Sequence, residues 1–269
     1  MDRLGAGGMA VVHRARDEWL KRDVAIKVIW QRMRQDMLAV RRFRREAQLG
    51  ARLVHPNIVA VLDAGAEPHD FIVMELVRGR DAGRLLKERH RPHLAAALRV
   101  LVQISDALQY MHDRGLIHGD VTPRNVVIRE DDGTAKLADF GLAQPFQDVV
   151  VNRPGHALGT PGYMAPELLE GAAPTPRADL YSLAAAAHAL LTGRLSTSMG
   201  DARATKSTTS AVPGPEPLAS FGPDLPHGVA DAIRQGLSHD PAARQASVAE
   251  FGAQVAGHRI APALLQAAA

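Results

Sequence analysis

The chain carries the sequence HGDVTPRN at residues 118–125 and, after an apolar stretch, DFG at residues 139–141. Asn125 follows Asp120 by five residues, and Asp139 comes after a predicted two-strand hairpin over residues 126–137. A carboxylate that can accept a hydroxyl proton, combined with an amide and a second carboxylate that offer oxygen ligands to a divalent cation, suits phosphoryl transfer. Spacing this specific rarely arises by chance, so it predicts both the chemistry and the fold.

Composition limits the kinds of protein that this chain can be. Its 269 residues, 46% of them hydrophobic, suffice for a sizeable core in one compact domain or a fused pair of lobes. The net charge is only +3, so no overall field favours nucleic acid as a partner. The absence of cysteine excludes disulfides and thiolate metal sites.

The apolar runs do not predict a membrane segment in this chain. The longest, Leu183 to Leu191, is too short to span a bilayer and is interrupted by His188. The N-terminus shows no apolar signal core. We therefore expect a cytoplasmic protein, and the high content of alanine and arginine is typical of a bacterial source.

Two regions differ in their periodicity. Residues 4–75 show short β-like runs (11–12, 24–29, 58–62 and 71–74) around one charged helix at residues 37–53. Amphipathic helices are predicted at residues 95–114 and 178–192 and again from Gly228 and from Val248. The pattern predicts an α+β protein with a small antiparallel sheet lobe at residues 1–77, a larger helical lobe at 78–258 and a tail at 259–269. Residues 196–217 are expected to form a mobile surface loop.

A glycine-rich turn near the N-terminus is followed by a lysine and a glutamate in a recognisable order. The turn is LGAGGMAVV at residues 4–12, Lys27 ends the β-run VAIK, and Glu46 lies on the charged helix. Together with FRREAQ at residues 43–48, HPNIV at 55–59 and the catalytic sequence, this order resembles the eukaryotic-type (Hanks-type) serine/threonine protein kinases of bacteria. The resemblance runs from Leu4 to about Val255, and it implies the two-lobed kinase fold.

The resemblance implies ATP as the nucleotide. Lys27 would hold the α and β phosphates and would itself be held by Glu46. Met74 falls at the gatekeeper position before the hinge, where the backbone of Glu75 and Val77 would bind adenine, and Asp81 falls near the ribose. The residues so assigned to the nucleotide are Leu4, Gly5, Gly7, Val12, Ala25, Lys27, Met74, Glu75, Val77, Asp81 and Val127. For the apolar members, ordinary core packing is an equally good explanation.

For the chemistry, the resemblance assigns Asp120 as the base, with Lys27, Glu46 and Arg124 as further catalytic residues. Asn125 and Asp139 would bind Mg²⁺, with Mn²⁺ as an alternative. The sequence GTPGYMAPE at residues 159–167 resembles a segment that docks protein substrates, with Thr160 against Asp120. Structural roles are implied for the pair formed by Glu167 and Arg244, and for Asp179 beneath the catalytic loop.

Gly119 and Thr122 depart from the family pattern. Gly119 replaces an arginine that in many members binds a phosphate on the activation loop, and residues 142–159 contain no Ser, Thr or Tyr. We therefore expect activity that does not depend on activation-loop phosphorylation. Thr122 replaces a lysine that reaches the γ phosphate, and Arg124 is expected to supply the missing charge. Ala10 replaces the third glycine of the turn, and the first strand is expected to be short.

Three functions were compared for this sequence. The favoured one is an ATP- and Mg²⁺-dependent protein kinase that acts on Ser or Thr of a protein substrate. The alternatives are a pseudokinase that acts as a nucleotide-responsive binding module, and a small-molecule phosphotransferase of the aminoglycoside or choline kinase type. No nucleic acid or membrane partner is expected, and homodimerisation is left open.

Overall fold

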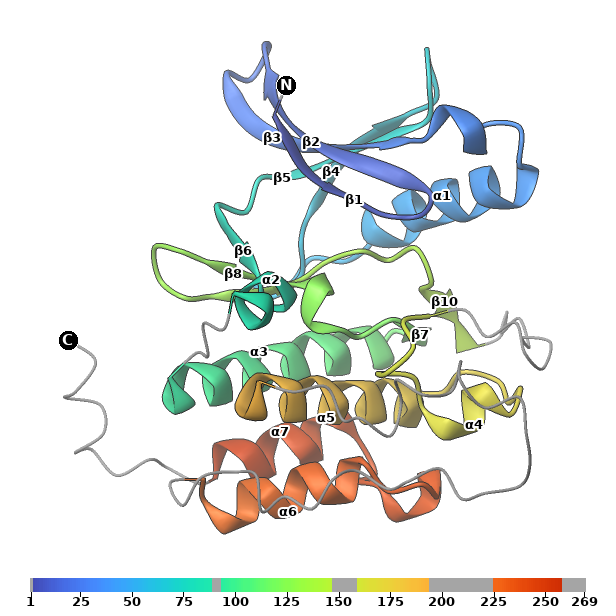
Figure 1. Cartoon of the computed structure of the whole chain (residues 1–269). Helices are drawn as coiled ribbons and strands as arrows, with labels where there is room; N and C mark the ends of the chain where they lie inside the picture. The colour runs from blue at the N-terminus through green and yellow to red at the C-terminus, as the bar shows by residue number, and fades with distance from the viewer. Residues whose placement is uncertain (1, 89–92, 147–158, 194–224, 258–269) are drawn as a thin grey trace.

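The computed structural model describes residues 2–88, 93–146, 159–193 and 225–257, which form a small lobe and a larger lobe (Figure 1). The small lobe holds a five-stranded antiparallel sheet in the order β1-β2-β3-β5-β4 and one long helix, α1 (Met37–Gly50). Its strands are β1 (Arg3–Ala6), β2 (Ala10–Asp17), β3 (Arg22–Ile29), β4 (Val61–Gly65) and β5 (Phe71–Glu75). A short 3-10 helix, η1 (Gln31–Met33), precedes α1. The predicted α+β architecture is confirmed.

Local sequence explains where α1 begins and what it covers. The Asp36 side chain accepts hydrogen bonds from the backbone N–H groups of Leu38 and Ala39, which caps the first turn. Val40 and Phe43, one turn apart, are buried against Ile29 and Ile72 of the sheet in a single apolar cluster. The helix therefore packs on the sheet through a continuous apolar stripe. This packing fixes the position of Glu46, one turn after Phe43, relative to the sheet.

The segment between α1 and β4 corrects two expectations. The helix ends at Gly50 rather than at residue 53. The predicted strand at residues 58–62 is wrong for its first half, because β4 begins only at Val61. Ile58 instead bridges Leu137 in parallel, and the Val59 N–H donates to the Leu137 carbonyl at 2.9 Å. Residues that read as a strand of the small lobe thus tie that lobe to the larger one.

The larger lobe contains the helices and two small sheets. The long helices are α3 (Leu94–His112) and α5 (Pro176–Thr192), and α6 (His227–Gly236) and α7 (Val248–Ala256) pack beside them. These four agree with prediction to within about two residues. The shorter elements are α2 (Ala82–Lys87), α4 (Pro166–Leu169), η2 (Pro123–Asn125) and η7 (Pro241–Ala243), with β6 (Gly79–Asp81), β7 (Leu116–Ile117), β8 (Val126–Arg129), β9 (Ala135–Leu137) and β10 (Gln144–Pro145).

The predicted hairpin at residues 126–137 is present as β8 and β9, and β6 pairs with the other edge of β8. The chain between β7 and β8 carries the HGDVTPRN sequence, and DFG follows β9. Both sequences therefore closely follow short strands of the larger lobe, β7 and β9. The predicted loop at residues 196–217 lies outside the described residues.

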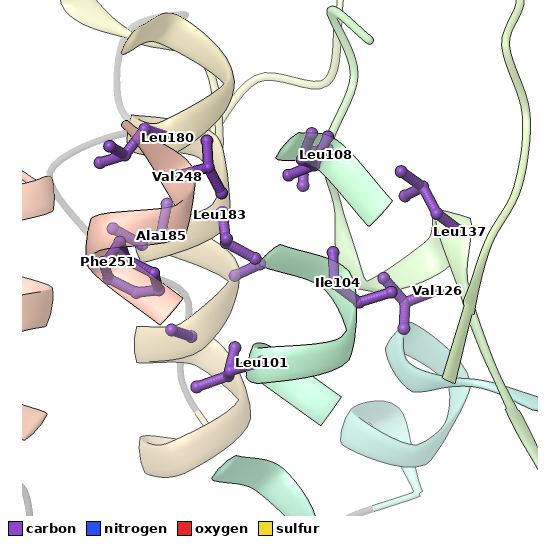
Figure 2. Close-up of a cluster of buried hydrophobic side chains, with 14 of the residues drawn as sticks. Leu101, Ile104, Leu108, Val126, Leu137, Leu180, Leu183, Ala185, Val248 and Phe251 are labelled. Atoms are coloured by element: carbon purple, nitrogen blue, oxygen red, sulfur yellow. The ribbon is translucent and has the colours of Figure 1, made fainter. Parts of the chain in front are cut away.

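Helix α5 is the centre of the larger lobe. Every residue from 178 to 190 is buried, because α3, α6 and α7 surround the helix. Figure 2 shows Leu180 and Leu183 of α5 in one apolar cluster with Leu101 of α3 and Phe251 of α7. Small residues permit this close approach: a Cβ added at Gly236 of α6 would lie only 2.8 Å from the Ala184 Cβ. None of the helices in the described ranges is long and apolar enough to cross a bilayer.

A buried ion pair between Arg244 and Glu167 connects two segments of the larger lobe. Arg244 donates from Nη1 and Nη2 to the two carboxylate oxygens of Glu167, both at 2.7 Å, and its guanidinium lies 4.8 Å from the centre of the Tyr181 ring. The Arg244 side chain is fully buried and also donates to backbone carbonyls, including that of Ser238. The predicted pairing of Glu167 with Arg244 is present, and it joins α4 to the segment after η7.

Replacing Arg244 by Met should destabilise the fold strongly. The change leaves the Glu167 carboxylate and several backbone carbonyls without their donor, which costs about 3–5 kcal/mol of unfolding free energy. Urea unfolding followed by circular dichroism measures this loss. Arg234→Met is the matched control, because Arg234 pairs with Asp231 on the exposed face of α6 and such pairs contribute under about 1 kcal/mol. Equal effects of the two substitutions would contradict the structural role of Arg244.

Candidate active site

Lys27, Glu46 and Asp139 meet between the lobes; the resemblance implied the pair of Lys27 with Glu46, whereas the contact of Lys27 with Asp139 was not predicted. The Lys27 Nζ lies 2.6 Å from Glu46 Oε1, 2.8 Å from Glu46 Oε2 and 2.9 Å from Asp139 Oδ1. These residues come from β3, from α1 and from the loop after β9. Asp139 has φ of 64°, which is unusual for a residue other than glycine, and its Oδ1 also accepts from the Gly141 N–H at 3.2 Å. One ammonium group thus connects three elements of both lobes.

The two carboxylates differ in their protonation because one ammonium cannot neutralise both of them. The Glu46 side chain is 3% exposed, and burial raises its pKa to about 7 despite the neighbouring Lys27. The Asp139 side chain is 48% exposed, and although desolvation opposes the shift, the Lys27 ammonium holds the pKa of Asp139 below its usual range. For Lys27, burial is outweighed by the two carboxylates, so its pKa is raised. At neutral pH, Asp139 is the ionised carboxylate of the pair.

Both oxygens of the predicted base, Asp120, are held by hydrogen bonds. Thr160 donates to Asp120 Oδ1 from its backbone N–H at 2.9 Å and from Oγ1 at 2.8 Å. Asn125 Nδ2 donates to Asp120 Oδ2 at 3.0 Å and to the Asp120 carbonyl at 2.8 Å. The segment at residues 159–167, called the docking segment, and the loop at residues 118–125, called the catalytic loop, therefore both orient the Asp120 carboxylate. The contact of Thr160 with Asp120 is the one that was predicted.

Asn125 and Asp139 fit a hard divalent cation. The Asn125 amide donates from Nδ2, which directs its oxygen away from Asp120. Asp139 presents its second oxygen, Oδ2, while Oδ1 is bound by Lys27. Oxygen donors of this kind suit Mg²⁺, which commonly takes one or two protein ligands and completes its shell with water and phosphate. Consistent with so sparse a set, no group of three His, Cys, Asp or Glu side chains in the described ranges could hold a metal ion.

The catalytic loop is held in place by hydrogen bonds to Asp179 of α5. The carboxylate accepts from the backbone N–H groups of His118 and Gly119, each at 2.8 Å, and contacts His112 Nε2 at 2.9 Å. Although burial alone would raise the pKa of Asp179, these hydrogen bonds lower it. Gly119 itself has φ of 79°, and an added Cβ would lie 3.0 Å from the Leu142 carbonyl oxygen. The loop is thus held through backbone groups, as the resemblance implied for Asp179.

The residues predicted to bind the nucleotide lie on neighbouring elements. On the sheet, Ala25 of β3 stands opposite Met74 of β5, and Val12 of β2 stands opposite Lys27. In the larger lobe, Val127 of β8 pairs with Asp81 of β6. Leu4 and Gly5 lie on β1, Gly7 lies in the turn between β1 and β2, and Val77 follows β5. Asp81 also caps α2, because its Oδ1 accepts from the Arg84 N–H at 2.8 Å.

β1 has only four residues, which agrees with the expected short first strand. Arg3 stands opposite His13 of β2, and the Arg14 N–H donates to the Asp2 carbonyl at 2.8 Å. The pairing therefore extends to Asp2, and the glycine-rich turn follows directly on β1.

Sequence reasoning missed two residues of this region, Lys136 and His112. Lys136 of β9 is buried and donates to Glu75 Oε1 at 2.7 Å, while the same oxygen accepts from the Ala60 N–H at 2.8 Å. A lysine inside an apolar strand directly before DFG was the available signal, because a buried ammonium needs a carboxylate. His112 carried no comparable signal, since only the fold brings it to Asp179.

The pKa of Glu46 predicts a pH dependence. Below about pH 7 the carboxylate gains a proton, and Lys27 then loses one of its two negative partners. We expect kcat/KM for the nucleotide, which reports ionisations of the free enzyme, to fall as the pH decreases through about 7. Steady-state rates between about pH 5.5 and about pH 8.5 provide the measurement.

Glu46→Gln is the control for this profile. The variant cannot titrate at this position, so its kcat/KM should be lower by about tenfold or more and should lack the acid limb near pH 7. A wild-type profile that stays flat down to about pH 5.5 would contradict the assignment.

Comparison with known proteins agrees with this geometry. The family model described as "Protein kinase domain" matches residues 1–249. Serine/threonine-protein kinase PknA of Mycobacterium tuberculosis is 36% identical over 262 residues, which cover 95% of this chain and 60% of PknA. For PrkC of Bacillus subtilis the identity is 32%, over 94% of this chain and 39% of PrkC. The crystal structure of the Mycobacterium tuberculosis PknI kinase domain is 32% identical with a TM-score of 0.72, and the match covers 96% of this chain and 94% of that domain.

Proposed function

The chain belongs to the protein kinase domain family, and on that premise we propose that it transfers the γ-phosphoryl group of ATP to Ser and Thr hydroxyls of proteins. The observation that carries the proposal is the placement of Asp120, which Thr160 and Asn125 orient at the lobe junction where Lys27 is paired with Glu46 and Asp139. The chain spans only part of the length of its curated relatives: 36% of a probable serine/threonine-protein kinase of Clostridium perfringens and 60% of PknA. The activity is therefore proposed for this domain alone.

Each residue of the site has a role in this reaction. Lys27 binds the nucleotide phosphates, and Glu46 keeps its ammonium in place. Asp120 orients the attacking hydroxyl and accepts its proton, while Arg124 adds positive charge beside the transferred group. Family members use ATP with a divalent cation; here Asn125 and Asp139 would hold Mg²⁺, which when bound offsets the charge on the phosphates.

The adenosine part of ATP is assigned to the junction of the lobes. Ala25 and Met74 are cross-strand partners on β3 and β5, and Val127 lies on β8 of the larger lobe. The backbone of Glu75 and Val77 offers the hydrogen-bonding groups for the purine. The remaining assigned residues, Leu4, Gly5, Gly7, Val12 and Asp81, would cover the phosphates and the ribose.

The acceptor is proposed to be a protein. The relatives PknA and PrkC are serine/threonine-protein kinases, and Thr160 of the segment at residues 159–167 donates hydrogen bonds to Asp120. An ATP-consuming enzyme without cysteine also fits a reducing cytoplasm, which we propose as its location.

A transfer assay tests the proposal. The purified chain is incubated with labelled ATP and Mg²⁺, alone and with a generic basic protein, and compared with Asp120→Asn. We expect label on protein, and we expect the variant to lose about 10²- to 10⁴-fold in kcat while its unfolding midpoint is unchanged. Label found only on small alcohols would indicate a small-molecule phosphotransferase. ATP binding without any transfer would indicate a pseudokinase.

We further propose that activity does not require phosphorylation of the activation loop. Residues 142–159 offer no hydroxyl acceptor, and Gly119 offers no side chain to bind a phosphate. The proposal is supported by the contacts that hold the site: Lys27 pairs directly with Glu46, and Asp179 holds the catalytic loop through backbone groups, so neither contact involves a side chain at position 119.

The test uses protein shown by mass spectrometry to carry no phosphate. Its initial rate of transfer should equal that of the same protein after incubation with ATP, without a lag phase. Phosphatase treatment that removes a phosphate from Thr160 and abolishes activity would contradict the proposal. A related kinase that requires loop phosphorylation serves as the positive control for the phosphatase.

A further inference from the structure

Two exposed arginines on adjacent elements, one of which follows the proposed base, have no carboxylate partner among the described residues. Arg84 lies on α2 and Arg124 on η2. Among the neighbouring cations, Arg80 pairs with Glu88 at 3.1 Å, whereas Arg78 approaches Asp23 at 3.4 Å and shares that carboxylate with Arg14 and Arg16. The structure therefore leaves positive charge unbalanced at one edge of the proposed active site.

The position of Arg124 is defined by its contacts. It lies between Pro123 and Asn125, four residues after Asp120. A Cβ added at Gly83 would come within 2.8 Å of Arg124 Cγ, so the stem of the arginine rests on the backbone of α2. Its charge also acts on Tyr163 in the segment at residues 159–167: burial raises the pKa of this phenol to about 12, and Arg124 opposes that rise. Arg124 thus lies against α2, close enough to this segment for its charge to be felt there, and four residues after the base.

The charge balance of this edge is positive. Asp81, at the end of β6, has no cationic partner among the described residues, and its Oδ1 accepts a hydrogen bond from the backbone N–H of Arg84. The Asp120 carboxylate is a second negative charge, since its partners Thr160 and Asn125 are uncharged. Against these two stand Arg84, Arg124 and the exposed Lys87 at the end of α2. Arg80 does not add to the positive charge because it pairs with Glu88, whereas Arg78 shares Asp23 with Arg14 and Arg16. A carboxylate arriving here would meet two or more unpaired cations.

We infer that Arg84 and Arg124 form a subsite for an acidic residue of the acceptor protein. The inference rests on the proposed function, since it concerns the peptide whose hydroxyl binds at Asp120. An extended chain advances about 3.3 Å per residue, so a residue roughly two or three places from the acceptor reaches α2 if the peptide runs from the docking segment across Arg124. The guanidinium groups can then bind its carboxylate through paired N–H donors.

The inference predicts which acceptors are phosphorylated efficiently. A Glu placed roughly two or three residues from the acceptor, on the side away from the docking segment, should raise kcat/KM about tenfold over Gln, as expected for one charge-assisted hydrogen-bonded contact at an exposed site. Lys at the same place should lower kcat/KM, and the difference between Glu and Lys should decrease at high salt.

Synthetic peptides with a single Thr test this prediction. Glu, Gln or Lys is placed in turn two or three residues before, and two or three residues after, the Thr, and kcat/KM is measured for each peptide with the full chain, ATP and Mg²⁺. Anisotropy of fluorescent peptides measures their binding to the same protein. A ratio of Glu to Gln near tenfold on one side of the Thr is the expected result, and ratios near one at every position overturn the inference.

Variants assign the preference to the two arginines. The measured ratio is kcat/KM for the Glu peptide divided by kcat/KM for the Gln peptide. In the variants Arg84→Gln and Arg124→Gln this ratio should fall by about threefold or more, and the variant Arg84→Glu should phosphorylate the Lys peptide preferentially. Because each ratio compares two peptides on one enzyme, any effect of Arg124 on the transferred phosphoryl group cancels. If Arg124→Gln slows all peptides equally and Arg84→Gln changes nothing, the subsite is refuted. Arg52→Gln is the matched control, since Arg52 is exposed at the end of α1 without an ion pair in the described ranges, and its ratio should equal that of the unaltered chain.

The two readouts separate failure of the subsite from failure of the proposed function. Transfer to all peptides with equal rates and equal binding keeps the proposed function and removes the subsite. Tighter binding of the Glu peptides without transfer to any of them keeps the subsite and removes the proposed function.

Discussion

The ammonium group of Lys27 is the contact on which the arrangement of the site depends. It stands within 3 Å of carboxylates from α1 and from the loop after β9, and it belongs to the central part of the sheet. A buried ammonium without partners would be very costly, so the sheet, the helix and the DFG segment are constrained to one relative placement. The same constraint leaves a surplus negative charge, because two carboxylates share one cation. Glu46 takes up the surplus through its raised pKa, and Asp139 remains ionised and accessible for a cation.

A second buried carboxylate, Asp179, performs the corresponding task in the larger lobe. It binds the backbone N–H groups of His118 and Gly119 and the side chain of His112, and so joins two separate segments to the deeply buried helix α5. The loop that carries Asp120 is therefore positioned by the packing of α5, whereas the side chain of Asp120 is positioned by Thr160 and Asn125. Since the loop is held by its backbone, glycine at position 119 does not interrupt the connection.

Much of this could be predicted from the sequence because the decisive residues lie in short motifs with fixed spacing. Asp120, Asn125 and Asp139 are identified by spacing alone, and the long helices are identified by their 3.6-residue periodicity. The helix α2 was missed because its six residues are too few to show a period. Residues 58–60 were misassigned because their apolar run fits a strand, while their actual partner, Leu137, is nearly eighty residues away in sequence. The pairs of Lys136 with Glu75 and of His112 with Asp179 join residues far apart in the chain, and no local pattern specifies them.

The complete burial of α5 has a consequence for the motions of the catalytic loop. Active-site loops usually open locally, at a free energy well below that of global unfolding. Here the His118 N–H is buried and bound to a carboxylate on a helix that can move only if α3, α6 and α7 separate from it. The amide hydrogen of His118 should therefore exchange with solvent about as slowly as the hydrogens at the centre of α5. The loop that holds Asp120 would then behave as part of the core of the larger lobe.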